Sequence, residues 1–330
     1  FKSRLKKLLD IVKERPDSYQ IRRISSAVKS GGECKVAGLV MDKRVRRGYT
    51  ELAIDDDTGK LSLLVRDESL RRQAGEVSLD QLVVVDVSFT ERGLAVVKGI
   101  YPPDISDHTP SFSKKNVYLA LTSDLHIGSR MFREGEFRRF LLWLKQNVED
   151  EYVVKRVKYI VLGGDVVDGV GVYPGQEKDL EEADVFKQYL KAAELLKEIP
   201  SRIHIFIIPG NHDPARQALP QPAIPRGYAA PLYEMENIAM LGNPAQLRLH
   251  GVNLLTYHGR SLDDVMANIP GLTFSKPASA MKILLKARHL APMYGGRTPI
   301  APEGEDDLVI EDVPDIFHAG HVHSIDADNY

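Results

Sequence analysis

The sequence has one cysteine, Cys34, in 330 residues, which excludes an internal disulfide framework and suits a reducing compartment such as the cytoplasm. It has no apolar run of the ~18 residues that a membrane-spanning helix needs, and its first residues are too charged for the apolar part of a signal peptide. Neither sign of charge is in excess, because 44 basic residues balance 46 acidic ones. Any binding of nucleic acid must therefore come from local patches.

The hydrophobic pattern divides the chain into four predicted regions. Residues 1–30 begin with apolar side chains at helical spacing and predict an N-terminal helical segment. Residues 31–102 change to a period of two and predict five strands with one helix between the third and the fourth. That pattern fits a small all-β Greek-key barrel of the OB type. Residues 103–115 carry prolines and serines and predict a linker, after which residues 116–330 form the second domain.

One patch that is both basic and aromatic lies in the first hairpin of the predicted barrel, at residues 43–49. OB barrels bind single strands in some proteins and serve only as docking units in others. The patch is therefore either a contact for nucleic acid or a solvated surface.

In the second domain, predicted strands alternate with predicted helices, which indicates a layered α/β architecture. The strands are expected at residues 116–122, 159–162 and 203–208, and the helices at 136–147 and 184–197. Residues 217–231 carry four prolines and predict an ordered loop. An insertion with a basic helix is expected at residues 262–314, and it forms either a cap over a site or a surface for a partner.

Polar side chains follow several of the apolar, strand-like runs, at points where loops of α/β sheets collect ligands. Seven of them are candidate metal ligands: Asp124, His126, Asp165, Asn211, His258, His321 and His323. Seven nitrogen and oxygen donors are too many for one tetrahedral ion, and they suit two ions that share a bridging carboxylate. Imidazole, carboxylate and amide donors without thiolate favour Mn²⁺, Fe²⁺ or Zn²⁺. Two such metals acidify a shared water and neutralise phosphoryl oxygens, so we expect hydrolysis of a phosphate ester.

Five short blocks in this order resemble the signature of the calcineurin-like metallophosphoesterase superfamily. They are Asp124-Leu125-His126, Gly164-Asp165-Val166-Val167-Asp168, Gly210-Asn211-His212-Asp213, His258 and Gly320-His321-Val322-His323. The resemblance implies a two-sheet sandwich flanked by helices. It also implies two ion sites, one formed by Asp124, His126, Asp165 and His323, the other by Asp165, Asn211, His258 and His321. Asp165 would then bridge the two ions.

The same resemblance implies roles for two residues outside the ligand set. His212 would donate a proton to the leaving oxygen or hold the scissile phosphate. Asp168 would accept a hydrogen bond from His212 and keep it protonated and oriented.

Longer strings at residues 121–129, 210–216 and 257–264 resemble the small subunits of archaeal family D DNA polymerases. That resemblance covers nearly the whole chain from residue 33 onward, including a barrel ahead of the phosphoesterase domain. It implies a 3′–5′ exonuclease that proofreads single-stranded or frayed 3′ ends for a separate large catalytic subunit. Two Mn²⁺ ions would be its cofactors, with Zn²⁺ or Fe²⁺ as alternatives.

Two other interpretations stay open at the level of sequence. A phosphomonoesterase or phosphoprotein phosphatase is disfavoured because such phosphatases usually have Arg and Glu where this chain has Gly169 and Asp213. An assembly scaffold is the third interpretation, since related eukaryotic B-subunits have lost metal ligands, although none is lost here. Arg216 and Arg260 follow ligand loops and either bind DNA phosphates or form structural salt bridges.

Overall fold

A computed structural model describes residues 1–15, 20–105, 108–145 and 151–330, and it divides the chain into two compact units. The first unit combines Phe1–His108, Ser261–Val313 and Ser324–Tyr330, and the second combines Thr109–Arg260 and Pro314–His323. The segment expected as an insertion of the second domain thus groups with the first unit. Parts of the predicted N-terminal segment, linker and first helix of the second domain, at residues 16–19, 106–107 and 146–147, lie outside the described residues.

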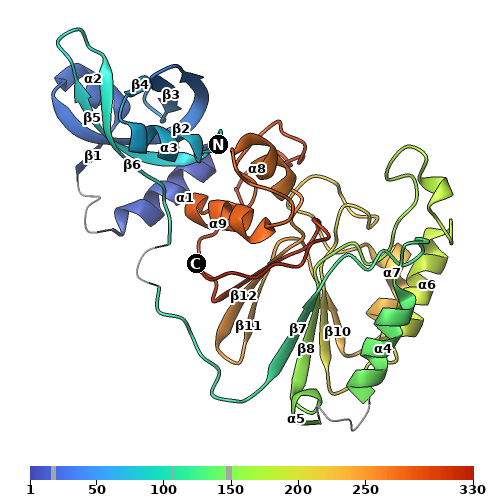
Figure 1. The fold of residues 1–330 in the computed structure, drawn as a ribbon. Helices are drawn as coiled ribbons and strands as arrows, with labels where there is room; N and C mark the ends of the chain where they lie inside the picture. Colours follow the sequence, from blue (N-terminus) through green and yellow to red (C-terminus); the bar gives the residue numbers. More distant parts are fainter. Residues whose placement is uncertain (16–19, 106–107, 146–150) are drawn as a thin grey trace. The chain divides into compact units, whose positions relative to one another are not determined.

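Five strands of the first unit close into a barrel (Figure 1). They are β2 (Glu33–Arg46), β3 (Tyr49–Asp55), β4 (Lys60–Val65), β5 (Leu82–Phe89) and β6 (Ala95–Tyr101). Their order is β2-β3-β4-β6-β5, and β5 pairs back to β2 along Glu33–Leu39. Helix α3 (Glu68–Gly75) lies between β4 and β5, where Asp67 caps it by accepting from the Leu70 N–H. The predicted all-β barrel of five strands with one helix is confirmed.

Two barrel strands, β2 and β5, are buried on both faces, which explains their continuous apolar runs. One set of their side chains packs inside the barrel and includes Val36, Val40, Val83 and Val85. Helix α1 (Lys2–Lys13) covers the other set, because its Leu5, Leu8 and Val12 cluster with Ala37, Leu39, Leu82 and Val84. Short elements β1 (Ile21–Arg22) and α2 (Ile24–Ser30) precede the barrel, and α8 (Leu262–Asn268) and α9 (Pro277–Ala287) belong to the same unit. Helix α9 is the predicted basic helix.

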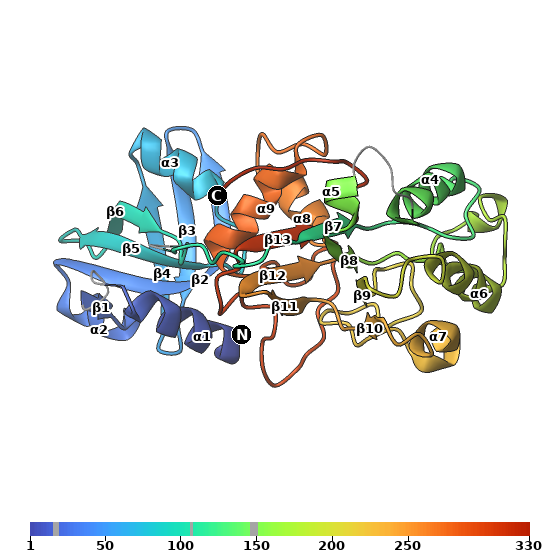
Figure 2. The same cartoon turned by 90° about the horizontal axis from the view of Figure 1, so that it is seen from below.

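The second unit contains two sheets, so the predicted mixed α/β class is confirmed. A parallel sheet has the order β10-β9-β8-β7, formed by Ile238–Met240, His204–Ile207, Val157–Leu162 and Tyr118–Thr122. A three-stranded sheet contains β11 (Ala245–Leu249), β12 (Val252–Tyr257) and β13 (Ile316–Ala319), with β12 and β13 parallel. Figure 2 shows the three-stranded sheet on one side of the parallel sheet and the helices α4 (Glu134–Lys145), α6 (Val185–Leu196) and α7 (Arg226–Tyr233) on the other.

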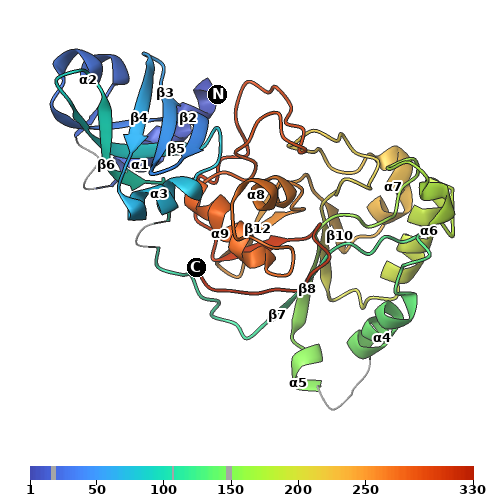
Figure 3. The ribbon, with the colours of Figure 1, turned by 45° about the horizontal axis from the view of Figure 1, so that its top comes forward.

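Helices α4, α6 and α7 cover the outer face of the parallel sheet (Figure 3). Their apolar side chains form one cluster with β8 and β9, including Leu141, Tyr189 and Leu232. The short α5 (Glu151–Val154) precedes β8. The prediction of a loop throughout residues 217–231 was wrong, because α7 begins at Arg226. The prolines of this helix resemble those of a loop. Pro225 precedes the first turn, and Ala229, two residues before Pro231, departs from helical φ and ψ.

No helix in the described part of the chain has both the length and the apolar character needed to cross a bilayer.

Candidate metal centre

The predicted ligands all lie just beyond the carboxyl ends of strands in the second unit. Asp124 and His126 follow β7, Asp165 follows β8, and Asn211 follows β9. Because these strands are parallel, their carboxyl ends share one edge of the sheet. His258 follows β12, and His321 with His323 follows β13, at one edge of the other sheet. A hydrogen bond of 2.9 Å between His258 Nδ1 and the Gly163 carbonyl joins the two edges.

Five of the seven predicted ligands have a left-handed backbone. The φ angles are 56° at Asp124, 49° at His126, 51° at Asp165, 73° at His321 and 55° at His323. Each such residue other than glycine costs about 1–3 kcal/mol and persists only where surrounding contacts hold it, typically at functional sites. Those contacts include backbone hydrogen bonds from Asp124 to the Gly164 carbonyl and from His126 to the Asp165 carbonyl. The backbone strain is therefore concentrated at the residues that carry the candidate ligand side chains.

The structure brings all seven predicted ligands together. Asp124, His126 and His323 form one set of convergent donor atoms, and Asp165, His258 and His321 form a second. A third group, His126, Asp165 and His212, shares one residue with each of these sets. Asn211 joins the second set, since its Oδ1 is 3.0 Å from His258 Nε2. Asp165 Oδ2 lies 3.3 Å from His258 Nε2 in one set and 3.7 Å from His126 Nε2 in the other. One carboxylate oxygen thus faces both sets.

The ring nitrogens that face this carboxylate are oriented by partners behind them. The Gly163 carbonyl can only accept, so His258 Nδ1 carries the hydrogen, and Nε2 is the atom turned toward Asp165 and Asn211. In the same way, His126 Nδ1 lies 3.0 Å from Asp168 Oδ1, and its Nε2 points to His323 Nε2 at 3.1 Å. Such partners fix the tautomer of a histidine that binds a metal.

The electrostatics favour a cation among these atoms. Burial pushes the pKa of Asp165 up, but the imidazoles of His258, His212 and His126 outweigh burial and hold that pKa well below its usual range. Burial lowers the pKa of His258, but the carboxylates of Asp165 and Asp124 outweigh burial and raise that pKa to about 9. An unprotonated His258 would direct a nitrogen lone pair at two oxygens. A proton or a metal ion at this point removes that repulsion.

His212 and Asp168 lie beside the ligands, but their contact differs from the predicted one. His212 Nδ1 is 2.8 Å from the backbone carbonyl of Asp168 and 3.6 Å from its carboxylate. The nearest imidazole to that carboxylate is His126, at 3.0 Å. Asp168 therefore orients a predicted ligand with its side chain and the candidate proton donor with its backbone. The His212 ring also meets the His126 ring edge-on, at 4.5 Å between centroids.

Three residues that support the site were not singled out for that role. Gln176 is buried, and its Nε2 donates to the carbonyl and to Oδ2 of Asp168, each at 2.9 Å. Asn243 Oδ1 accepts from the His258 N–H at 2.9 Å. Asp213 joins two ligand loops, because it accepts from the Gly210 N–H, the Val166 N–H and the Tyr189 hydroxyl. Only Asp213 had a signal in the sequence, as part of the third block.

The two predicted phosphate-binding arginines contact the loop after Asn211. Arg260 Nη1 donates to Gln217 Oε1 at 2.9 Å, and Arg216 Nε donates to the Ala218 carbonyl at 3.2 Å. Their binding of phosphate stays a prediction.

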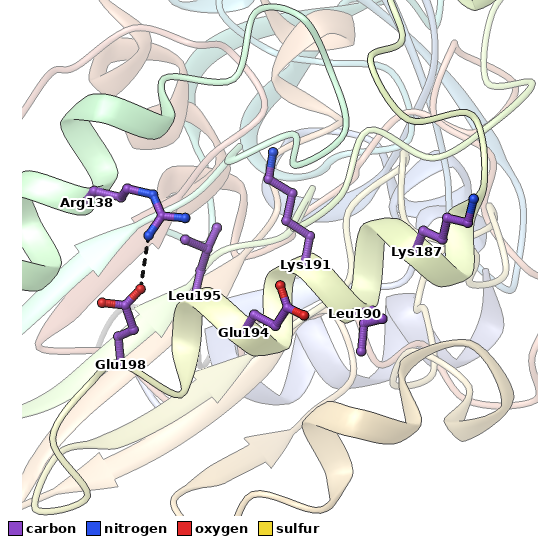
Figure 4. Close-up of a pocket in the computed structure, with 7 residues that line it drawn as sticks. All are labelled: Arg138, Lys187, Leu190, Lys191, Glu194, Leu195 and Glu198. Atoms are coloured by element: carbon purple, nitrogen blue, oxygen red, sulfur yellow. Dashed lines mark hydrogen bonds and ion pairs between the residues drawn. The ribbon is translucent and has the colours of Figure 1, made fainter.

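A separate surface hollow lies over α4 and α6 (Figure 4). It is lined by Arg138, Lys187, Leu190, Lys191, Glu194, Leu195 and Glu198. Its charges are partly paired within the protein, since Arg138 binds Glu134 at 2.8 Å and Glu198 at 3.1 Å. None of the seven candidate metal ligands lines this hollow. The candidate metal centre at the strand ends is therefore a different site.

Comparison with known proteins gives the family. Residues 119–325 match the model of the DNA polymerase alpha/epsilon B-subunit. The DNA polymerase II small subunit of Pyrococcus furiosus is 46% identical over 99% of this chain and 55% of its own length. Those of Archaeoglobus fulgidus and Methanothermobacter thermautotrophicus are 42% and 41% identical over 98% of this chain, and over 66% and 68% of their own lengths. The chain spans about half the length of the Pyrococcus relatives.

The chain therefore belongs to the DNA polymerase alpha/epsilon B-subunit family, within which it is similar to the small subunits of archaeal DNA polymerase II.

Proposed function

We propose that the second unit is a 3′–5′ exonuclease that hydrolyses DNA phosphodiester bonds with two divalent metal ions, as part of a proofreading DNA polymerase. The observation that carries this proposal is the position of Asp165, whose Oδ2 faces His126 Nε2 and His258 Nε2 from two separate donor sets. A carboxylate between two such sets suits a pair of ions, because one ion cannot use all seven donors.

The donor set indicates which residues would hold each ion. One ion would be held by Asp124, His126, Asp165 and His323, and the other by Asp165, Asn211, His258 and His321. Imidazole, carboxylate and amide donors without thiolate suit Mn²⁺, with Zn²⁺ or Fe²⁺ as alternatives. When bound, two such ions acidify a water molecule and neutralise the phosphoryl oxygens.

His212 would act on the substrate. Its Nδ1 is held by the Asp168 carbonyl at 2.8 Å, and its backbone N–H donates to Asp165 Oδ1 at 2.8 Å. These two contacts fix the ring and leave Nε2 to hold a proton for the leaving oxygen or to bind the scissile phosphate. Gln176 and Asp168 would position His126 behind it.

The fold supports the same proposal. We assign the barrel to the OB type, because the helix α3 precedes its fourth strand and its strand order closes on the first strand. We assign the second unit to the calcineurin-like metallophosphoesterases on its two sheets and its five motif loops at strand ends. The relatives are named as small subunits, so the proposed partner is a large polymerase subunit, and the proposed substrate is a single-stranded or frayed 3′ end of DNA.

The test uses the complete small subunit, alone and with its large partner, on a primer with a 3′ mismatch and Mn²⁺. We expect release of nucleotides that falls at least about a hundredfold in Asp124→Ala and in His212→Ala. His204→Ala is the matched control, since His204 is an exposed histidine of β9, the strand that leads to His212. Unchanged rates in both site variants would refute the assignment.

The same samples separate the two other functions. A higher rate on a small aryl phosphate than on single-stranded DNA would indicate a phosphomonoesterase. Assembly with the large subunit without binding of metal ions would indicate a scaffold.

A further inference from the structure

An exposed aromatic ring lies next to the residue that would meet the leaving oxygen. The Tyr173 ring is 6.1 Å from the His212 ring between centroids, and the two planes are inclined at 61°. Tyr173 is 40% exposed, whereas Tyr189 and Tyr257 of the same unit are fully buried. The ring therefore offers a face to solvent at the edge of the candidate site.

The loop that carries Tyr173 is fixed by contacts to the site. Its Gly169 lies so close to His212 that an added Cβ would be 2.2 Å from the His212 carbonyl oxygen. Farther along, Gln176 Oε1 accepts from the Val172 N–H at 2.8 Å, while Gln176 Nε2 donates to Asp168. The backbone on the near side of Tyr173 is thus tied to the residues that position His126 and His212.

The phenol end of the ring is fixed as well. The Tyr173 hydroxyl donates to Asp179 Oδ2 at 3.0 Å. The phenol is uncharged at neutral pH, because its ordinary pKa of about 10 is raised further by partial burial and by this carboxylate, to about 12. A backbone contact at one end and a hydroxyl contact at the other hold the ring in one orientation and leave 40% of the residue exposed.

A ring that is held still and only partly covered loses conformational freedom and keeps part of its apolar surface in water. Nucleic acid offers a compensating contact, because every base has a face that stacks on an aromatic side chain, whatever the sequence. We propose that Tyr173 is the stacking platform for the terminal base of the DNA strand whose phosphate meets His212. This inference rests on the proposed exonuclease function and adds to it a basis for preferring nucleotides over small phosphate esters.

The test compares two oligonucleotides that differ only at the 3′ terminal residue, which carries either a normal base or an abasic sugar. On the complete protein with its large subunit, we expect kcat/KM to be about tenfold higher for the normal end, which equals about 1.4 kcal/mol. Tyr173→Ala should lose that preference and keep the rate on the abasic end within about twofold. Tyr173→Phe, which keeps the ring and loses only the Asp179 contact, should keep the preference.

A binding measurement that needs no turnover accompanies the rates. A 3′-terminal 2-aminopurine should lose fluorescence on binding to the native protein and to Tyr173→Phe, but not to Tyr173→Ala, with thermal melting as the check of folding. An equal loss of rate on both ends in Tyr173→Ala, or no loss on either, would overturn the stacking role while leaving the exonuclease intact. Failure of the native protein to degrade either oligonucleotide would instead overturn the proposed function, and the stacking role with it.

Discussion

His258 Nε2 lies 3.3 Å from Asp165 Oδ2, and both side chains are almost completely buried. A buried carboxylate and a buried imidazole at this distance need a positive charge between them or a proton on the ring. The Gly163 carbonyl holds Nδ1 on the other side of the ring, so rotation of His258 cannot relieve the conflict. The pair would therefore form a rigid half of the proposed cation site.

Metal stoichiometry follows from the position of Asp165 between the two donor sets. We expect the native protein to bind two Mn²⁺ ions, Asp165→Ala to bind fewer than one, and Asp124→Ala to keep one, because Asp124 belongs to a single set. Equilibrium dialysis with elemental analysis measures the ratio. His204→Ala, a histidine change outside both sets, should keep two ions. Retention of two ions by Asp165→Ala would exclude a bridging role.

Gln176 links the loop of Tyr173 to Asp168, and its removal should affect both stability and rate. Gln176→Leu removes two hydrogen bonds to Asp168 and leaves buried polar groups without donors, which costs about 1–3 kcal/mol of unfolding free energy. Because Asp168 orients His126, the rate of the proposed exonuclease should also fall about tenfold. Urea unfolding and primer degradation measure the two effects. Glu177→Gln, at the exposed neighbouring position, should stay within about 0.5 kcal/mol of the native protein.

The gathering of these seven side chains could be predicted because each follows a short apolar run and stands in a recognisable block. Asp124 and His126 sit two residues apart after β7, and the same spacing returns at His321 and His323 after β13. What the blocks do not contain is the direction of each hydrogen bond. The Asp168 carboxylate lies closer to His126 than to the expected His212. Which histidine it contacts depends on how the loops after separate strands meet, and the blocks do not contain that information.

Contacts between distant parts of the chain that no motif marks were beyond sequence reasoning. Gln176 lies in a loop without hydrophobic periodicity, so no pattern marks it. The grouping of Ser261–Val313 with the first unit depends on pairs such as Arg4 and Asp306, which are 302 positions apart and meet at 2.8 Å. Helix α7 was missed for a local reason, because its prolines resemble those of a loop.

Gly210 tests how closely the ligand loops must approach. A Cβ at this position would lie 2.1 Å from Asp165 Oδ1 and 2.5 Å from the Asp165 backbone nitrogen. Gly210→Ala should therefore displace Asp165 and reduce Mn²⁺ affinity at least about tenfold, measured by calorimetric titration. Gly227→Ala is the control, because nothing lies within 4 Å of its added Cβ. Native affinity in Gly210→Ala would show that the two loops can separate without loss of the site.

The pH dependence of the first unit should depend on His289, which is buried. Its Nδ1 accepts from the Ala291 N–H at 3.0 Å, and its Nε2 donates to Asp306, which also binds Arg4. Burial and the charge of Arg4 lower the pKa of His289 to about 4, against the pull of Asp306.

The sign of the effect follows from that shift. The unfolded chain takes up the His289 proton near its ordinary pKa of about 6.5, whereas the folded protein does so only near 4, so stability falls as the pH decreases through this window. The pKa of Asp306 is also lowered, which extends the loss to lower pH. Urea unfolding between pH 7 and pH 4 should show a decrease on the order of 3 kcal/mol more than in His289→Gln, which cannot titrate. Equal pH profiles for the two proteins would mean that the pKa of His289 is the same in the folded and the unfolded protein.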